Sequence, residues 1–326
     1  MAEPKKQQQQ LDLKETQQQP QQPPQQQQAQ PPATKAAPQV LKTDEIKDPV
    51  QRFAVIMNTY EMQVLPDLLK SFGIEPALFK QTVINEVKRS DKLMEAFIKN
   101  PASMFASILA GAQIGLIPSE MLGLFYLIPR NLKQSDGRYL PTVTPLIGYK
   151  GIVNILMRSP DITRIHTEVV YKGDVFEPVY GLEPNIIHKP NFEASRTAAD
   201  ITHVYAVVKM RGEHNFAIMT REQILAVKAM SKYDNDLYFN DKQNPNRWME
   251  RKTALIQLAK MLPKEYHLNL ALEMDSKLNG GATAILDDEG NVKFVEGSII
   301  RPTRFRNIYG TFGKEQQQPQ LPDGNQ

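Results

Sequence analysis

The chain has 326 residues and a net charge of +3, because 39 lysines and arginines stand against 36 aspartates and glutamates. It contains no cysteine, which excludes disulfides, thiolate zinc sites and cysteine nucleophiles. No apolar run approaches the ~20 residues that a membrane-spanning helix needs, and the N-terminus lacks the apolar core of a signal peptide. We therefore expect a cytoplasmic protein with no membrane partner.

The charges are unevenly distributed along the chain. Residues 130–172 carry seven cations and three acids, and residues 209–264 carry eleven cations and six acids. Residues 270–300 reverse the sign, with two cations and six acids. Such segregation is typical of a protein that presents a basic face to a polyanion, although scattered surface charge can give similar counts.

Both ends of the chain are rich in glutamine and proline. Residues 1–40 and 311–326 have too little apolar surface to offset the entropy of ordering, which predicts two disordered tails. Between them we expect a main domain over residues 41–275 and a small acidic segment over residues 276–310, which could form a hairpin. The tails are expected to be dispensable for activity.

Helix signals dominate the first part of the folded region. A proline suited to a first helical turn predicts a helix from Pro49, and apolar residues at helical spacing predict another over 76–89. Asn100 followed by proline predicts the N-cap of a helix over 102–114. Small residues on one face of that helix let another helix approach, from within the fold or from a neighbouring subunit: Ala102, Ala106 and Ala110.

Beyond residue 118 the pattern changes to strands. Residues 123–129 and 139–147 predict a β-hairpin, because an Asp-Gly turn signal lies between them. The hairpin loop carries three cations, Arg130, Lys133 and Arg138, which form either a finger that contacts phosphates or a solvated loop. Further strands are predicted at 164–170, 174–179, 201–210 and 214–219.

The predicted hairpin leads directly into residues 148–158, which we expect to form a helix. At about 100° per residue, its apolar residues gather on one side, and two cations and an amide gather on the other: Lys150, Asn154 and Arg158. Gly148 and Gly151 flank the lysine, and glycine there permits a tight helix start or the close approach of another backbone or a phosphate. The alternative is an ordinary amphipathic helix with a solvated polar face.

A helix capped by Thr220 and a polar loop over 231–246 are expected next. The aromatic side chains of that loop either stack on bases or pin the loop to the core: Tyr233, Tyr238 and Phe239. A helix over 245–262 then carries the only tryptophan, Trp248, which we assign to the core. A further helix is predicted over 265–278 and a small hairpin over 285–295.

Several catalytic signatures are missing from the sequence. There is no P-loop motif and no Gly-x-Ser-x-Gly motif, and the five histidines lie in no metal-binding spacing. No compact grouping of Asp, Glu and Lys suggests a metal-dependent nuclease. These observations argue against an enzyme.

Three stretches form a specific combination, although each is short. They are residues 111–118 (Gly-Ala-Gln-Ile-Gly-Leu-Ile-Pro), residues 125–129 (Phe-Tyr-Leu-Ile-Pro) with 148–151 (Gly-Tyr-Lys-Gly) and Arg158, and residues 251–254 (Arg-Lys-Thr-Ala) with 258–263 (Leu-Ala-Lys-Met-Leu-Pro). In order and spacing over about 50–275, the chain resembles the RecT family of phage-type single-strand DNA annealing proteins.

The resemblance implies an α+β fold in which a small antiparallel β-sheet packs with several helices, as in RecT and Redβ. It implies a recombinase that coats single-stranded DNA, pairs it with a complementary strand and supports strand invasion, without ATP or a catalytic centre. It further implies rings or helical filaments, an exonuclease and a host single-strand-binding protein as partners, and a phage or prophage gene in a bacterial host. No cofactor is expected, and an effect of Mg²⁺ on DNA binding is left open.

The same resemblance assigns roles to residues at the matching positions. Lys150 and Arg158 are expected to contact phosphates, and Asn154 to add a backbone hydrogen bond. Gly148 and Gly151 are expected to let DNA approach. The other members of the expected DNA-binding set are Tyr149, Lys252, Lys260 and Arg251, of which Arg251 has a structural alternative, and Arg130, Lys133 and Arg138, which rest on local charge.

Two other classes of protein stay open at this point. One is an oligomeric structural or assembly protein, in which the basic face and the alanine-rich helix serve subunit contacts. The other is a metal-dependent nuclease. The first predicts no preference for single strands, and the second predicts metal-dependent loss of DNA strands.

Overall fold

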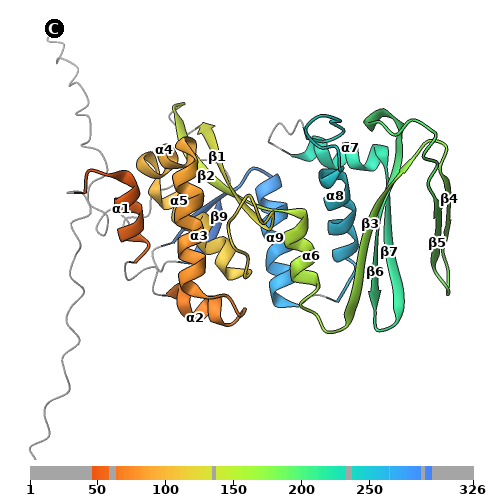
Figure 1. The fold of residues 1–326 in the computed structure, drawn as a ribbon, viewed down its shortest axis with the longest axis horizontal. Coiled ribbons are helices and arrows are strands. Elements are labelled where there is room, and N and C mark those ends of the chain that lie inside the picture. The colour runs from red at the N-terminus through yellow and green to blue at the C-terminus, as the bar shows by residue number, and fades with distance from the viewer. Residues whose placement is uncertain are drawn as a thin grey trace, which may run out of the picture. The chain divides into compact units, whose positions relative to one another are not determined.

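The computed structural model describes residues 46–58, 64–133, 137–231, 237–263, 265–287 and 291–295. The chain divides into two units, Met1–Gln39 and Val40–Gln326, and every described residue belongs to the second. The predicted tails, 1–40 and 311–326, lie outside the described residues. The described part is mixed α and β, with helices and small antiparallel sheets, which confirms the expected α+β class (Figure 1).

Helices make up the first part of the described chain. They are α1 (Pro49–Ile56), α2 (Val64–Lys70), α3 (Pro76–Arg89), α4 (Asp91–Lys99) and α5 (Pro101–Gln113). Side-chain caps fix three of the starts, because Asp48, Ser90 and Asn100 each accept a hydrogen bond from a backbone N–H of the first turn. The predicted helices from Pro49, over 76–89 and over 102–114 are confirmed.

Helix α5 is buried from Pro101 to Ala112, all but its last residue. It packs against strand β2 (Tyr139–Ile147), and two serines anchor it there. The Ser107 hydroxyl donates to the Val143 carbonyl over 3.0 Å, and the Val143 N–H donates to the Ser103 hydroxyl over 3.0 Å. Because all three alanines of its small-residue face are buried within one chain, close packing inside the fold accounts for them.

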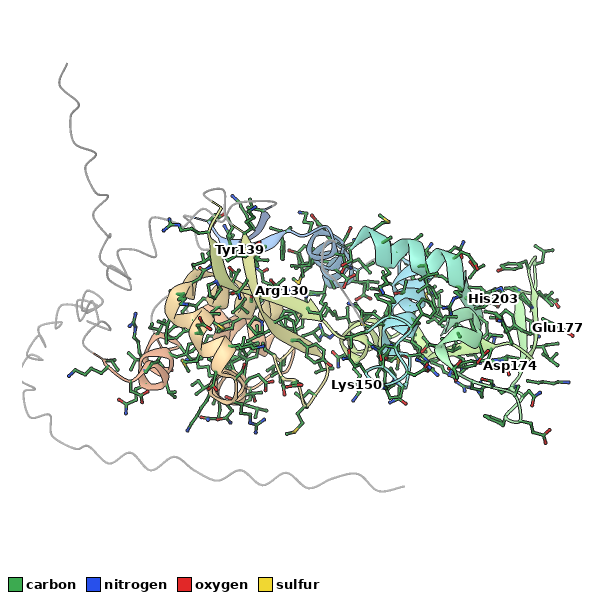
Figure 2. The ribbon with its side chains drawn as sticks, turned by 90° about the horizontal axis from the view of Figure 1, so that it is seen from above. Arg130, Tyr139, Lys150, Asp174, Glu177 and His203 are labelled. Atoms are coloured by element: carbon green, nitrogen blue, oxygen red, sulfur yellow. The ribbon has the colours of Figure 1, made fainter. Side chains whose placement is uncertain are left out.

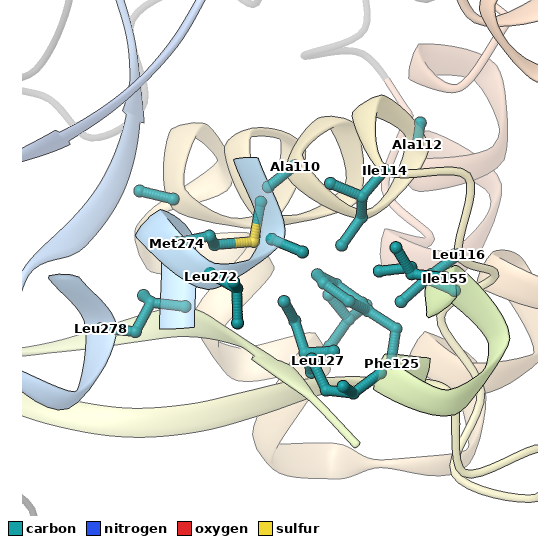
Figure 3. Packing of buried hydrophobic residues seen from close by; sticks show 14 of the residues in the cluster. Ala110, Ala112, Ile114, Leu116, Phe125, Leu127, Ile155, Leu272, Met274 and Leu278 are labelled. Atoms are coloured by element: carbon teal, nitrogen blue, oxygen red, sulfur yellow. The ribbon is translucent and has the colours of Figure 1, made fainter. Parts of the chain in front are cut away.

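The predicted hairpin forms from β1 (Phe125–Lys133) and β2, which pair antiparallel from Phe125 opposite Ile147 to Lys133 opposite Tyr139. Helix α6 (Tyr149–Leu156) follows β2 after one residue. Figure 3 shows the core where these elements meet α5 and α9 (Tyr266–Asn279), with Ala110, Phe125, Ile155 and Met274 converging. The core therefore holds α6 in place from several sides.

A second sheet has the strand order β3-β6-β7, all antiparallel, from β3 (Ile162–Tyr171), β6 (Ile201–Met210) and β7 (Glu213–Thr220). A separate two-stranded sheet consists of β4 (Val175–Val179) and β5 (Asn185–Lys189). Helices α7 (Arg221–Met230) and α8 (Trp248–Ala259) pack on the three-stranded sheet. The predicted strands, the Thr220 cap and the helix over 265–278 are confirmed.

The last described elements are β8 (Thr283–Leu286) and β9 (Val292–Val295), which pair antiparallel. This confirms the small hairpin predicted over 285–295. The hairpin packs on α5, so that this part of the acidic segment 276–310 belongs to the same fold as the residues before it. The segment beyond Val295 lies outside the described residues.

Candidate nucleic-acid interface

The start of α6 is built by a close contact between two backbones. The Gly148 N–H donates to the Leu124 carbonyl over 2.9 Å. A Cβ atom at Gly148 would lie 2.2 Å from the Gly123 carbonyl oxygen, and one at Gly151 would lie 2.2 Å from the Leu124 carbonyl oxygen. Glycine is needed at both positions because the protein's own chain approaches here. This packing explains both glycines without DNA, whose approach stays a prediction.

Lys150 lies at this helix start with its side chain exposed. The aliphatic part of the side chain passes over Gly123, whose ideal Cβ position lies 3.4 Å from Lys150 Cδ and 3.3 Å from the Tyr126 hydroxyl. Lys150 has no hydrogen-bond or ion-pair partner among the described residues. Partial burial, with Glu120 nearby, raises the pKa of Tyr126, so its hydroxyl stays protonated at neutral pH. Lys150 is therefore available to an anion.

Arg158 is predicted on the same face as Lys150, but it is half-buried and fully engaged. Its guanidinium donates to the carbonyls of Ile114 and Gly115 over 2.7 Å each, and to Asn154 Oδ1 over 2.8 Å. It also lies over the Phe72 ring, 4.9 Å from the centroid. The two carbonyls end helix α5, so the cation caps that helix where its dipole is negative. A phosphate contact by Arg158 or Asn154 would compete with these bonds.

Tyr149 and Trp248 form an aromatic pair between α6 and α8. Their ring centroids lie 5.1 Å apart, and the Tyr149 hydroxyl lies 2.8 Å from the Thr167 hydroxyl of β3. Trp248 is 44% exposed, so its assignment to the core is wrong. It occupies the first position of α8, and the interior there is filled by Glu250, which is completely buried.

Glu250 explains how the polar loop before α8 is held. Its carboxylate accepts from the Phe239 N–H over 2.5 Å and from the Asn244 amide over 2.6 Å. The Tyr238 hydroxyl lies 2.9 Å from that of Thr253, and the Arg221 guanidinium covers the Phe239 ring at 4.2 Å. Tyr238 and Phe239 therefore pin the loop to the core. Tyr233 lies outside the described residues.

Arg251 and Lys252 both point into the protein. Arg251 donates to the Thr167 carbonyl and to the Glu168 carboxylate, which ties α8 to β3 and supports its structural alternative. Lys252 donates to Asp275 of α9 over 2.7 Å, and both side chains are under 10% exposed. A DNA contact by Lys252 would require it to leave Asp275. The sequence pattern of a Lys-Thr on a helix does not reveal this partner, which lies 23 residues away.

The remaining predicted cations lie apart from these residues. Lys133 and Arg138 are exposed near the hairpin tip, Arg130 is half-buried on β1, and Lys260 is exposed just after α8. Figure 2 shows Lys150, Arg130 and Tyr139 following the β1–β2 hairpin from its base toward its tip. Eight strand steps of ~3.3 Å separate Phe125 from Lys133 at the two ends of β1 by about 26 Å, or roughly eight phosphate spacings of 3.4 Å. The cations thus form a track rather than a single pocket.

The described residues contain no group of three His, Asp or Glu side chains that could hold a metal ion. None of the described helices combines the length and apolarity required to cross a membrane.

The described fold is thus an α+β domain with exposed cations at the β1–β2 hairpin and at α6, and with a buried ion pair between Lys252 and Asp275. The chain belongs to the RecT family, because the model of that family matches residues 77–285, more than half of the chain. This confirms the resemblance found in the sequence. The chain is also similar to Protein RecT of Escherichia coli (strain K12), with 35% identity over 181 residues. That match covers 54% of this chain and 63% of the relative, which is less than two thirds of its length.

Proposed function

We propose that this protein binds single-stranded DNA and promotes the annealing of complementary strands in homologous recombination, without ATP and without covalent chemistry. The observation that carries the proposal is the RecT-family match over residues 77–285. These residues include the β1–β2 hairpin, α6, the three-stranded sheet and α8. The proposal extends to strand exchange, to assembly into rings or filaments, and to an exonuclease and a host single-strand-binding protein as partners.

The geometry supports DNA contact by the exposed members of the predicted set rather than by those that are bound within the protein. A protein that anneals strands must neutralise phosphate backbones without reading sequence, which requires exposed cations and flat surfaces for bases. Lys150, Lys133 and Lys260 are exposed and have no partner among the described residues. Trp248 offers an exposed ring face next to Tyr149. We therefore assign DNA contact first to Lys150 and Trp248.

The decisive experiment mixes two complementary oligonucleotides that carry a fluorescent donor and acceptor, with the full-length protein present and ATP absent. Faster duplex formation, with strand lengths unchanged on a denaturing gel, supports the proposal. Parallel reactions with Mg²⁺ and with EDTA test whether the ion affects DNA binding. Shortened strands in Mg²⁺ alone would favour the nuclease, and no preference for single strands would favour the assembly protein.

Variants of the two assigned residues connect the activity to this surface. Lys150→Ala removes one phosphate contact, so the slope of log affinity against log salt should fall by about 0.7 on single strands. Trp248→Ala should weaken binding by about 1–3 kcal/mol, the usual contribution of one stacked base, while Trp248→Phe keeps most of it. Lys92→Ala, an exposed lysine on α4 without a partner among the described residues, is the matched control. Equal slopes for Lys150→Ala and Lys92→Ala would remove Lys150 from the interface.

A further inference from the structure

One face of the three-stranded sheet gathers basic side chains from all three strands. Arg164 of β3 lies directly opposite Lys209 of β6, and Lys209 lies directly opposite His214 of β7. His166 follows on the same face of β3, two residues after Arg164, because side chains alternate along a strand. None of these residues was singled out as a site by sequence reasoning, since they come from three separate strands.

This arrangement works against the stability of the sheet. Residues directly opposite each other on neighbouring strands have Cβ atoms about 5 Å apart, and like charges in such pairs are destabilising. Arg164 and Lys209 have no acidic partner among the described residues, nor any other side-chain hydrogen bond there. The described residues therefore place no neutralising anion beside these two cations, since Glu168, on the same face of β3, pairs with Arg251.

The basic row lies in a cavity rather than on a flat surface. Arg164, His166, Lys209 and His214 line a hollow of ≈ 180 Å³ together with Tyr205 and with Ile186 of β5. The β4–β5 hairpin forms one wall, because its alternation directs Phe176, Ile186 and His188 toward the sheet and Lys189 away from it. The hollow thus has an apolar wall and a basic floor.

The wall is held rigidly over the sheet. The Phe176 ring stacks on Tyr205 with centroids 5.7 Å apart, and His188 Nδ1 lies 3.1 Å from the Tyr205 hydroxyl. His188 Nε2 lies 3.1 Å from Asp174, which also accepts from Arg196 over 2.7 Å. Figure 2 shows Asp174 and His203 at this sheet, with Glu177 on the adjoining hairpin. The cavity is accordingly formed before any ligand arrives.

The chemistry of the lining selects an anion with several oxygens. Arg164 offers a fork of N–H donors, Lys209 offers an ammonium group, and the two imidazoles offer further N–H donors. Partial burial lowers the pKa of His166, and Arg251 and Arg164 lower it further against the opposing charge of Glu168, so at neutral pH His166 contributes a hydrogen bond rather than a charge. The phosphates of a strand satisfy such a set, because each phosphodiester presents two non-bridging oxygens and several phosphodiesters follow one another along the strand.

We propose that this hollow, lined by Arg164, Lys209, His166 and His214, binds phosphate groups of a nucleic-acid strand, as a site separate from Lys150. The inference rests on the proposed function and deepens it, because annealing requires contacts to two backbones. It places one set of contacts on the hairpin and α6, and a second on the sheet. A free nucleotide is the other source of the same phosphate chemistry.

The test uses the full-length protein, a fluorescein-labelled oligothymidylate and a salt titration. Arg164→Ala and Lys209→Ala should each lower the magnitude of the slope of log affinity against log salt by about 0.7, and the double variant by about 1.4. Lys209→Arg should keep the slope, since it retains the charge. Lys189→Ala, on the outer side of the same hairpin, is the matched control and should also keep it.

Thermal unfolding distinguishes a binding role of these cations from a structural role, because the two roles predict opposite changes in the unfolding temperature. Because removing either cation relieves repulsion across the strands, both alanine variants should unfold at the same temperature as the wild type or higher. Lower unfolding temperatures together with unchanged slopes would show that the residues support the fold, and would overturn the inference.

The remaining outcomes separate this site from the proposed function. If the wild type binds and anneals DNA while both variants keep its slope, the phosphate site is wrong and the proposed function stands. If dATP or inorganic phosphate protects the wild type against unfolding but the DNA slope does not change in the variants, the hollow takes free phosphate and not a strand. If the wild type does not bind the oligothymidylate, the proposed function is wrong, and the phosphate site that rests on it is wrong too.

Discussion

Lys150 and Arg158 differ in their surroundings, although a helical projection of the sequence places them on one face. Lys150 is exposed and without a partner among the described residues, whereas Arg158 donates to two carbonyls at the end of α5. The side chain of Arg158 reaches residues more than 40 positions earlier in the chain. Helical periodicity describes local geometry only, so it could not distinguish an exposed cation from one that caps a distant helix.

We expect Arg158→Ala to lower the free energy of unfolding by about 1–3 kcal/mol, because hydrogen bonds to a charged group contribute about that much when half-buried. Urea unfolding followed by circular dichroism measures the change. Lys150→Ala is the comparison and should leave stability within about 0.5 kcal/mol of the wild type. Equal stability of Arg158→Ala and the wild type would show that the α5 cap contributes little, and Arg158 would again be a candidate for DNA contact.

The buried pair of Lys252 and Asp275 leads to a second expectation. Among the described residues, Lys252→Ala leaves the buried Asp275 carboxylate with the Asn279 amide as its remaining partner, so stability should fall by about 3–5 kcal/mol. The double variant Lys252→Met with Asp275→Leu removes both charges and should recover most of that loss. If the single variant is stable and its DNA binding is weak, then Lys252 contacts DNA as the family resemblance implied.

Asp174 makes the stability of the folded protein depend on pH, and the direction of that dependence follows from its pKa. Hydrogen bonds from the backbone N–H groups of Tyr171 and Asn191, and from His188 and Arg196, hold its pKa at about 2 despite burial. The pKa of an unfolded aspartate is higher, about 3.9. The stabilisation is therefore complete above about pH 4 and is lost as the pH falls toward 2. Asp174→Asn should flatten that part of the stability profile, and an unchanged profile between pH 4 and 2 would contradict the assignment.

At the scale of elements, the contact between α6 and the Gly123–Leu124 backbone decides how the candidate interface is held. A methyl group at Gly148 or Gly151 would lie 2.2 Å from a backbone carbonyl oxygen, which cannot move aside as a side chain can. Gly148→Ala and Gly151→Ala should each cost about 2–3 kcal/mol or more in unfolding free energy. Lys92→Ala, at an exposed position of α4, is the control. Normal stability combined with lost DNA binding would favour the original role of these glycines in DNA approach.

Elements with strong local signals were predictable from the sequence, and the others were not. Pro49, Asn100 and Thr220 mark helix starts through cap chemistry, and the Asp-Gly turn marks the hairpin. Helices α2 and α4 and strand β5 were missed, and β5 forms only by pairing with β4. The basic cavity could not be predicted either, since its residues meet only after three strands have paired.

At the scale of the whole molecule, the described residues account for the proposed interface without the ends of the chain. All cations assigned to DNA lie between residues 130 and 260, and the family match ends at residue 285. A chain limited to residues 41–310 should therefore anneal oligonucleotides at the rate of the full-length protein. The donor–acceptor assay measures this directly. A large loss of rate would assign a function to the glutamine-rich ends.

Trp248 also makes the unmodified protein its own optical probe. It is the only tryptophan in 326 residues, it is 44% exposed, and its ring lies beside Tyr149 at the junction of α6, α8 and β3. Its emission therefore reports on one place in the molecule. A base that stacks there quenches the emission, whereas a ligand confined to the sheet cavity leaves it unchanged. The same sample can thus show which surface a strand occupies, with no label attached to the protein or to the DNA.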